Sequence, residues 1–157
     1  MSRVQLALNV ADIDEAVAFY SKLFGTEPAK RRPGYANFAI ADPPLKLVLI
    51  ENDEAQAGSL NHLGVEVAST DDVTAAQARL AAEELPTAVE GQVSCCYAVQ
   101  DKVWVDGPGG EPWEIYTVLA DVDSEPGTLR TAGPSGAACC ASRPDLAVAA
   151  AGPSSCC

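Results

Sequence analysis

The chain has 157 residues, of which 48% are hydrophobic, and this length and composition suit one globular domain with a hydrophobic core. Its 22 acidic side chains outnumber its 10 lysines and arginines, and a formal net charge of -12 argues against nucleic acids and anionic membranes as partners. No stretch approaches the roughly 20 apolar residues of a membrane span. The N-terminus runs into strand-like sequence rather than an export signal, so we expect a cytoplasmic protein with reduced thiols.

The first half of the chain predicts a strand, a helix and three further strands. Apolar side chains alternate over residues 4–10, which predicts a strand with Gln5 on its polar face. Asp12 and Glu15 predict the capped start of a helix, and Gly25 predicts its end. The next strands are expected at residues 29–32, 35–40 and 45–51.

The second half repeats this order of elements. Residues 62–67 alternate as residues 4–10 do, with His62 in the place of Gln5. Ser69 and Asp72 predict the start of a helix that runs to about residue 84. The remaining strands are expected at residues 88–93, 102–106 and 113–119. Strand, helix and three strands, taken twice, predict an α+β fold.

All six cysteines occur as adjacent pairs: Cys95 and Cys96, Cys139 and Cys140, Cys156 and Cys157. Two neighbouring thiolates can both bind one soft pyramidal centre such as trivalent arsenic, whereas a disulfide between adjacent residues would close a small strained ring. The alternative for any one pair is a chance occurrence of small apolar side chains.

The C-terminal part of the chain differs in composition from the rest. From about residue 124 it consists largely of Gly, Pro, Ser and Ala, which predicts a disordered tail over residues 123–157 after a folded domain of residues 1–122. Only the pair Cys95 and Cys96 therefore lies within the domain, in a loop between two predicted strands. The four tail cysteines could capture an arsenical or a metal, or have no role.

Three polar side chains on predicted strands form a candidate metal site: Gln5, His62 and Glu114. His62 is the only histidine, and Glu114 stands in an otherwise apolar strand, where a carboxylate is costly unless it is paired or bound to a metal. Nitrogen and oxygen donors suit a divalent first-row metal such as Fe(II), Mn(II), Ni(II) or Zn(II). The alternative is that Gln5 and Glu114 face solvent.

The two modules, the segment Asn-His-Leu-Gly-Val-Glu-Val (61–67) and the segment Gly-Pro-Gly-Gly-Glu-Pro-Trp-Glu-Ile-Tyr (107–116) resemble the vicinal oxygen chelate superfamily, which has the glyoxalase I and extradiol dioxygenase fold. Over residues 2–119 this resemblance implies two βαβββ modules, whose mixed sheet curls around a metal held by Gln5, His62 and Glu114. Lys46 stands where glyoxalase I-like enzymes carry a fourth ligand, a glutamate that also acts as the base. The absence of this glutamate argues against isomerase chemistry.

The pair Cys95 and Cys96 narrows the resemblance to the Fe(II)-dependent carbon–arsenic lyases related to cadmium-induced proteins. This branch implies an Fe(II) cofactor and oxygen-dependent cleavage of the C–As bond of trivalent organoarsenicals, methyl or aromatic, to arsenite, with arsenic bound by both thiolates. The implied partners are the organoarsenical, such as methylarsonous acid, and O2, without nucleic acid or membrane. A homodimer stays open by analogy with the superfamily. Two alternatives remain: a thiol-based protein that sequesters cadmium or arsenic, and another metal-dependent glyoxalase-like enzyme or a thiol transferase.

Overall fold

The structure of the protein, a computed structural model, describes residues 2–95 and 97–122, and at Cys95 it describes the backbone alone. The predicted tail, with its two cysteine pairs, lies outside the described residues. Within them the chain forms the predicted α+β fold. The elements in chain order are β1 (Arg3–Val10), α1 (Ile13–Phe24), β2 (Lys30–Arg32), β3 (Tyr35–Ile40), β4 (Leu45–Glu51), β5 (Leu60–Glu66), α2 (Thr70–Ala82), β6 (Thr87–Cys95), β7 (Ala98–Asp106) and β8 (Pro112–Asp121).

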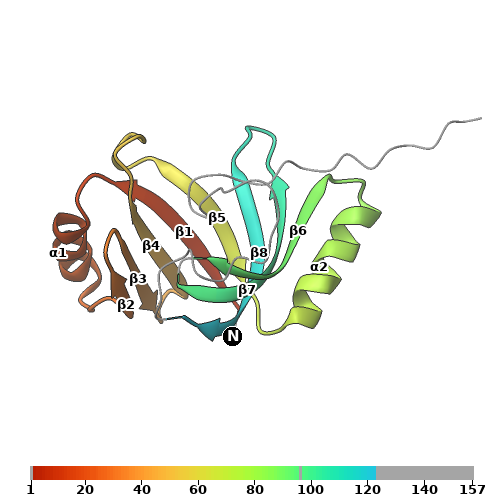
Figure 1. Cartoon of the computed structure of the whole chain (residues 1–157), viewed down its shortest axis with the longest axis horizontal. Helices are drawn as coiled ribbons and strands as arrows, with labels where there is room; N and C mark the ends of the chain where they lie inside the picture. Colours follow the sequence, from red (N-terminus) through yellow and green to blue (C-terminus); the bar gives the residue numbers. More distant parts are fainter. Residues whose placement is uncertain (1, 96, 123–157) are drawn as a thin grey trace, which may run out of the picture.

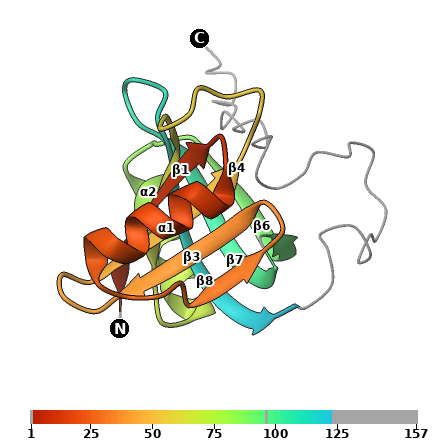
Figure 2. The ribbon, with the colours of Figure 1, turned by 90° about the vertical axis from the view of Figure 1, so that its left-hand side faces the viewer.

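The strands form one mixed sheet in the order β2-β3-β4-β1-β5-β8-β7-β6. The first strands of the two modules, β1 and β5, are antiparallel neighbours at its centre, and each pairs in parallel with the last strand of its own module. The helices lie at opposite ends of the molecule with the strands between them (Figure 1), and in the view turned by 90° α1 lies in front of the strands of its module (Figure 2).

The sheet curls until its two ends meet. Tyr35 belongs to β3, next to one edge strand, and Tyr97 follows β6, the other edge strand. Their ring centroids nevertheless lie only 5.7 Å apart, and both side chains share a buried cluster with Ala7, Val48 and Ile50. The predicted curled sheet is therefore confirmed, and its concave face carries alternate residues of β1.

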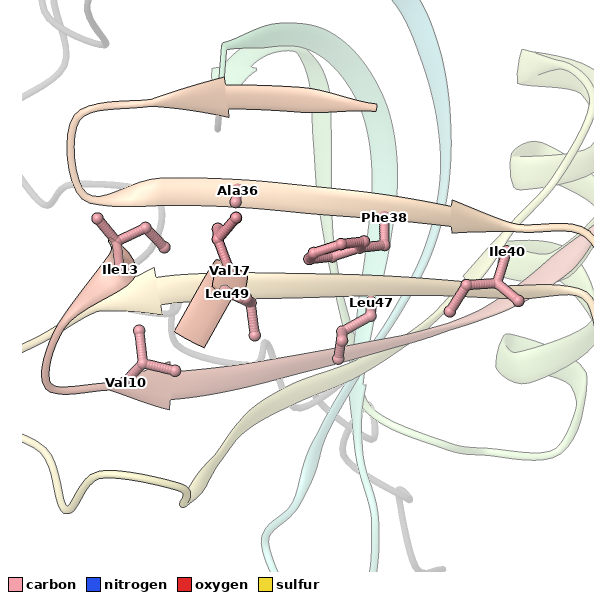
Figure 3. Close-up of a cluster of buried hydrophobic side chains, with 8 residues drawn as sticks. All are labelled: Val10, Ile13, Val17, Ala36, Phe38, Ile40, Leu47 and Leu49. Carbon is pink, nitrogen blue, oxygen red and sulfur yellow. The ribbon is translucent and has the colours of Figure 1, made fainter. Parts of the chain in front are cut away.

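Helix α1 has the bounds that its sequence signals predict. The Asp12 side chain accepts hydrogen bonds from the backbone N–H groups of Asp14 and Glu15 at 2.8 and 2.9 Å. Gly25 ends the helix with a φ of 62°, a left-handed conformation that costs glycine little. The helix packs on the convex face of the first module through a buried apolar cluster, shown in Figure 3: Val10, Ile13, Val17, Ala36, Phe38, Ile40, Leu47 and Leu49.

Two predicted boundaries in the second module are wrong. Helix α2 ends at Ala82 rather than near residue 84, because Glu84 takes a left-handed φ of 58°. Cys95 does not lie in a loop, since β6 extends to Cys95 and pairs with Ala98 at the start of β7. A bulge between Glu90 and Val93 breaks the alternation of β6, and this hides its second half from a reading of the sequence.

Candidate metal centre

One row of paired residues crosses the middle of the concave face. From strand to strand the register partners are Lys46, Gln5, Gly64, Glu114 and Trp104. His62 lies two residues before Gly64 on β5, so its side chain is on the same face. The neighbours of these residues in sequence, such as Leu6 and Ile115, pack toward the helices instead.

The structure brings the three predicted ligands together. The amide nitrogen Nε2 of Gln5 lies 3.0 Å from Nε2 of His62 and donates to Oε1 of Glu114 at 2.7 Å. Nε2 of His62 is 3.4 Å from the same carboxylate oxygen. The exposed fractions of Gln5, His62 and Glu114 are 4%, 8% and 3%, so the alternative that Gln5 and Glu114 face solvent is wrong.

The amide of Gln5 faces the other two side chains through its nitrogen. Its oxygen Oε1 accepts a hydrogen bond from the Tyr116 hydroxyl, which also lies 3.1 Å from Oε2 of Glu66. A half-turn of the amide would direct Oε1 at the shared centre and let Nε2 donate to Tyr116, whose hydroxyl would then donate to Glu66. Without a cation only the first orientation is satisfied, because after the half-turn Oε1 of Gln5 would face Oε1 of Glu114; a cation bound between these two oxygens would satisfy the second orientation.

Glu114 is held as a carboxylate by a buried lysine. Burial alone would raise the pKa of Glu114, but the Lys102 ammonium, aided by His62, outweighs burial and lowers this pKa to about 2. Nζ of Lys102 donates to Oε2 of Glu114 at 2.8 Å, and the residue Lys102 is only 2% exposed. Oε1, the other oxygen, is the one that faces Gln5 and His62.

Lys46 is the register partner of Gln5 on β4, and its ammonium is bound away from the three ligands. Its Nζ lies 3.3 Å from Oε2 of Glu66, and Arg3 donates to both oxygens of this carboxylate at 3.1 and 3.2 Å. Burial lowers the pKa of Lys46 although the Glu66 carboxylate opposes the shift. The place of a fourth protein ligand is therefore taken by a cation with its own carboxylate partner.

The donor set and the distances of 2.7 to 3.4 Å between its atoms fit a divalent metal. The described residues contain no cluster of three or more His, Cys, Asp and Glu side chains suited to a metal, so a metal bound by His62 and Glu114 would take the Gln5 amide as its third protein donor. Gly64 lies between Gln5 and Glu114, and a methyl group there would stand 3.1 Å from Cγ of Glu114 and 3.3 Å from Cβ of Gln5. Imidazole nitrogen with two oxygen donors suits Fe(II), Mn(II) or Zn(II).

The turn that follows Cys95 and Cys96 packs on the same concave face. Tyr97 is buried in the cluster that contains Ala7, and Ala7 is the register partner of His62. The backbone oxygen of Tyr97 accepts from Nζ of Lys30 at 3.2 Å, which ties the turn to β2. The side chains of Cys95 and Cys96 lie outside what the structure describes, so their role as arsenic ligands stays a prediction.

Several residues of the site had only a weak signal in the sequence, or none. Tyr116 and Trp104 are aromatic strand residues of a kind that is more often core, yet Tyr116 binds Gln5 and the Trp104 ring lies edge-on to His62 with centroids 5.5 Å apart. Glu66 lies on the same predicted polar face of its strand as His62, and this alternation was the sequence signal that could have placed it near the site. Lys102 gave none, because its partner is 12 residues away on another strand.

Gln100 is a further buried polar residue on the concave face of β7. It lies on the same face as Lys102 and is 6% exposed. Its Oε1 has no hydrogen-bond partner among the described residues.

No helix among the described residues is long and apolar enough to cross a membrane.

Curated relatives cover most or all of the chain. The cadmium-induced protein CadI of Mycobacterium tuberculosis is 65% identical over 124 residues, which are 79% of this chain and 81% of that protein. The trivalent organoarsenical cleaving enzyme of Thermomonospora curvata is 57% identical over 157 residues, all of both chains. A probable trivalent organoarsenical cleaving enzyme of Bacillus subtilis is 35% identical over 74% of this chain and 80% of its own.

Solved structures and a family profile agree on the fold. The Mn(II)-bound glyoxalase of Novosphingobium aromaticivorans aligns with a TM-score of 0.56 and 22% identity, over 78% of this chain and 42% of that one. An extradiol ring-cleaving dioxygenase of B. fuscum gives 0.55 and 20%, over 77% and 34%. The profile of the glyoxalase/bleomycin resistance protein/dioxygenase superfamily matches residues 3–115. The chain belongs to this superfamily.

Proposed function

We propose that the protein is a cytoplasmic detoxification enzyme that cleaves the C–As bond of trivalent organoarsenicals, such as methylarsonous acid, with Fe(II) and O2. One observation carries the proposal. Gln5, His62 and Glu114 converge on the concave face against which the turn after Cys95 and Cys96 is packed. The name of the relative from Thermomonospora curvata, which matches the whole chain, supports the same substrate class.

The ligands of the metal would be Oε1 of Gln5, Nε2 of His62 and Oε1 of Glu114. Three protein ligands leave coordination positions open, and a bound Fe(II) would supply them for dioxygen and substrate. Lys102 keeps Glu114 ionised through its other oxygen, so the carboxylate is ready to bind a cation. Glu66 is bound by Arg3 and Lys46 beside the site, so its carboxylate is not available as a fourth ligand.

The thiols of Cys95 and Cys96 would replace both hydroxyls on arsenic, and each hydroxyl would leave as water with the proton of the thiol that replaces it. The methyl group is then the only other substituent, and a fixed orientation toward the metal favours its oxidation over a random encounter. The overall reaction balances as methylarsonous acid plus O2 giving arsenite, as As(OH)3, plus formaldehyde. Arsenic stays trivalent, while carbon loses four electrons and O2 gains them.

A Cys96→Ser variant tests the thiol assignment. With one thiolate lost, arsenic keeps a hydroxyl and the methyl group is no longer oriented, so we expect arsenite release to fall by at least about tenfold while iron content stays normal. The matched control is Cys140→Ser in the tail, with normal release expected. A Cys96→Ser protein with normal iron content and a normal rate would overturn the role of the thiols.

The second candidate function is sequestration of thiophilic metals. It is favoured by six cysteines that all occur as pairs, and the 65% identical relative is named for its induction by cadmium. Removal of residues 123–157 separates the two functions, because it deletes four of the six thiols. The enzyme should retain its turnover, whereas a sequestering protein should lose most of its cadmium capacity in equilibrium dialysis.

A further inference from the structure

We propose that Asn61 is a positioning residue that fixes the tautomer of His62. In this tautomer the proton is on Nδ1, so the lone pair of Nε2 is already available when a metal arrives. The importance of this tautomer rests on the proposed metal role of His62. The hydrogen bonds that fix it are present in the protein without a metal.

A bulge in β5 brings the two side chains together. In a regular strand Asn61 and His62 would point to opposite faces. Here Ala7 pairs with His62 while the next residue of β1, Leu8, pairs with Leu60, so Asn61 is the extra residue on β5. Bulges redirect a side chain in this way. Oδ1 of Asn61 lies 2.7 Å from Nδ1 of its neighbour His62.

The direction of the hydrogen bonds is set from the Glu114 end. An ionised carboxylate only accepts, so the Gln5 group 2.7 Å from Oε1 of Glu114 has to be the NH2 group. The same NH2 group lies 3.0 Å from Nε2 of His62, and this nitrogen therefore has to be the acceptor. In a neutral imidazole the proton is then on Nδ1, which donates to Oδ1 of Asn61.

The series of hydrogen bonds continues beyond Asn61, with each amide donating to the next residue. Nδ2 of Asn61 donates to Oδ1 of Asn9 at 2.8 Å, and Nδ2 of Asn9 donates to Oγ of Ser59 at 3.0 Å. Asn9 is 5% exposed. Its backbone N–H donates to the backbone oxygen of Ser59, and its backbone oxygen accepts from the N–H of Gly58. The Asn61 amide is thus held with its oxygen toward His62.

This arrangement gives Asn61 a role that outlasts metal binding. A metal ligated by Oε1 of Gln5 would take the Gln5 NH2 group away from His62. Asn61 would then be the group that keeps the proton on Nδ1, and outer hydrogen bonds of this kind commonly change metal affinity by about 10–100-fold.

The test uses the fact that the chain has a single histidine. Full-length protein labelled with 15N-histidine and free of metal is studied by two-bond 1H–15N correlation spectroscopy at about pH 8, above the ordinary pKa of imidazole. We expect wild-type protein to show a protonated Nδ1 and an unprotonated Nε2. Because the Gln5 NH2 group fixes the same tautomer in the metal-free protein, the variants at Asn61 are also studied in a Gln5→Leu background. Gln5→Leu should keep the wild-type pattern, Gln5→Leu/Asn61→Ala should give a mixture of tautomers, and Gln5→Leu/Asn61→Asp, which keeps an acceptor, should restore the pattern.

The affinity of the His62 site is measured on the same proteins by following the His62 resonances while Zn(II), a diamagnetic probe, is added in competition with a chelator, so that Zn(II) bound by the six cysteines is not counted. Asn61→Ala should weaken binding by about 10–100-fold and Asn61→Asp by much less. Asn52→Ala is the matched control, because the amide oxygen of Asn52 accepts from the backbone N–H of Glu54 instead, and it should bind normally.

The outcomes separate this inference from the proposed function. An Nε2–H tautomer in wild-type protein, or an unchanged tautomer in Gln5→Leu/Asn61→Ala together with an unchanged affinity in Asn61→Ala, would overturn the positioning role. If the tautomers behave as expected but Zn(II) leaves the His62 resonances unmoved, the positioning role stands and the metal role of His62 fails.

Discussion

Lys102 is the residue that allows a carboxylate to stand in the middle of the sheet. Glu114 and Lys102 are 3% and 2% exposed, and their charges would each be costly if buried alone. Together they form an ion pair at 2.8 Å. The pair leaves Oε1 of Glu114 directed at Gln5 and His62, so the same contact stabilises the fold and prepares the site.

Loss of the lysine charge should destabilise the metal-free protein strongly. Lys102→Met leaves a buried carboxylate without its cation, and breaking a buried pair in this way typically costs about 3–5 kcal/mol of unfolding free energy. Urea unfolding followed by circular dichroism measures the change. The control Lys22→Met alters an exposed residue of α1 and should stay within about 0.5 kcal/mol of wild type. A loss below about 1 kcal/mol in Lys102→Met would contradict the account.

The same pair predicts a dependence of stability on pH. The pKa of Glu114 falls from an ordinary 4.5 to about 2 in the folded protein, so the unfolded chain takes up the proton first as pH falls. The stability that Glu114 contributes is therefore fully present above pH 4.5 and is lost as pH falls toward 2. Urea unfolding across this interval should show a shallower pH slope for Glu114→Gln than for wild type. The slope should be unchanged in Glu54→Gln, a variant at an exposed position.

Residue-scale chemistry was only partly predictable from the sequence. Glu114 stood out because a carboxylate interrupts an apolar strand, and the structure brings it to Gln5 and His62 as predicted. Its cation was not predictable, since contacts across strands depend on register. The bulge at Asn61 was hidden for the same reason.

At the scale of the elements, β5 places the site through a residue without a side chain. Gly64 lies between the strands that carry Gln5 and Glu114, and their side chains close over it. Helices α1 and α2 leave this face free because they pack on the opposite, convex one.

A methyl group at Gly64 should damage the site more than the fold. In Gly64→Ala the new carbon would stand 3.1 Å from Cγ of Glu114, so the two ligand side chains have to separate. We expect Zn(II) affinity to fall by about tenfold or more, as it does when the surroundings of a metal are disturbed. Gly91→Ala is the control, because its nearest atom is 3.9 Å away, and its affinity should be normal. Equal affinities in the two variants would exclude a tight metal centre here.

The elements themselves were largely predictable. Residues 35–40 and 45–51 form strands with the predicted bounds, and α1 begins and ends at its capping residues. The hairpin of β6 and β7 was not predictable at its full length. In the sequence the bulge at Gly91 and Gln92 resembles the end of a strand, and the second half of β6 is recognised only from its pairing with β7.

On the scale of the whole molecule, the two modules close on each other through Tyr97. Its ring packs with Tyr35, Val48 and Ile50 from the other module, and its hydroxyl lies 3.5 Å from the backbone oxygen of Pro33. This closure brings the turn after Cys95 and Cys96 over the face that carries the candidate ligands. Sequence alone predicts the two modules, but the contact between them depends on how far the sheet curls.

Tyr97→Ala should weaken this closure. The loss of a buried aromatic ring typically costs about 3 kcal/mol of unfolding free energy. Zn(II) affinity should change little, because the Tyr97 hydroxyl is directed at the backbone oxygen of Pro33. Thermal and urea unfolding measure the loss. Val89→Ala, at a position that is 54% exposed on β6, should cost less than about 0.5 kcal/mol. Similar losses in both variants would show that Tyr97 does not hold the modules together.

The central claim is tested most directly by the stoichiometry of a single reaction. Protein loaded anaerobically with Fe(II) is given methylarsonous acid and a known amount of O2, and arsenite, formaldehyde and residual O2 are measured together. The account predicts one arsenite and one formaldehyde for each O2 consumed, and no arsenite without O2 or in His62→Ala. Arsenite released at an equal rate without O2, or none released by iron-loaded protein in air, would contradict it.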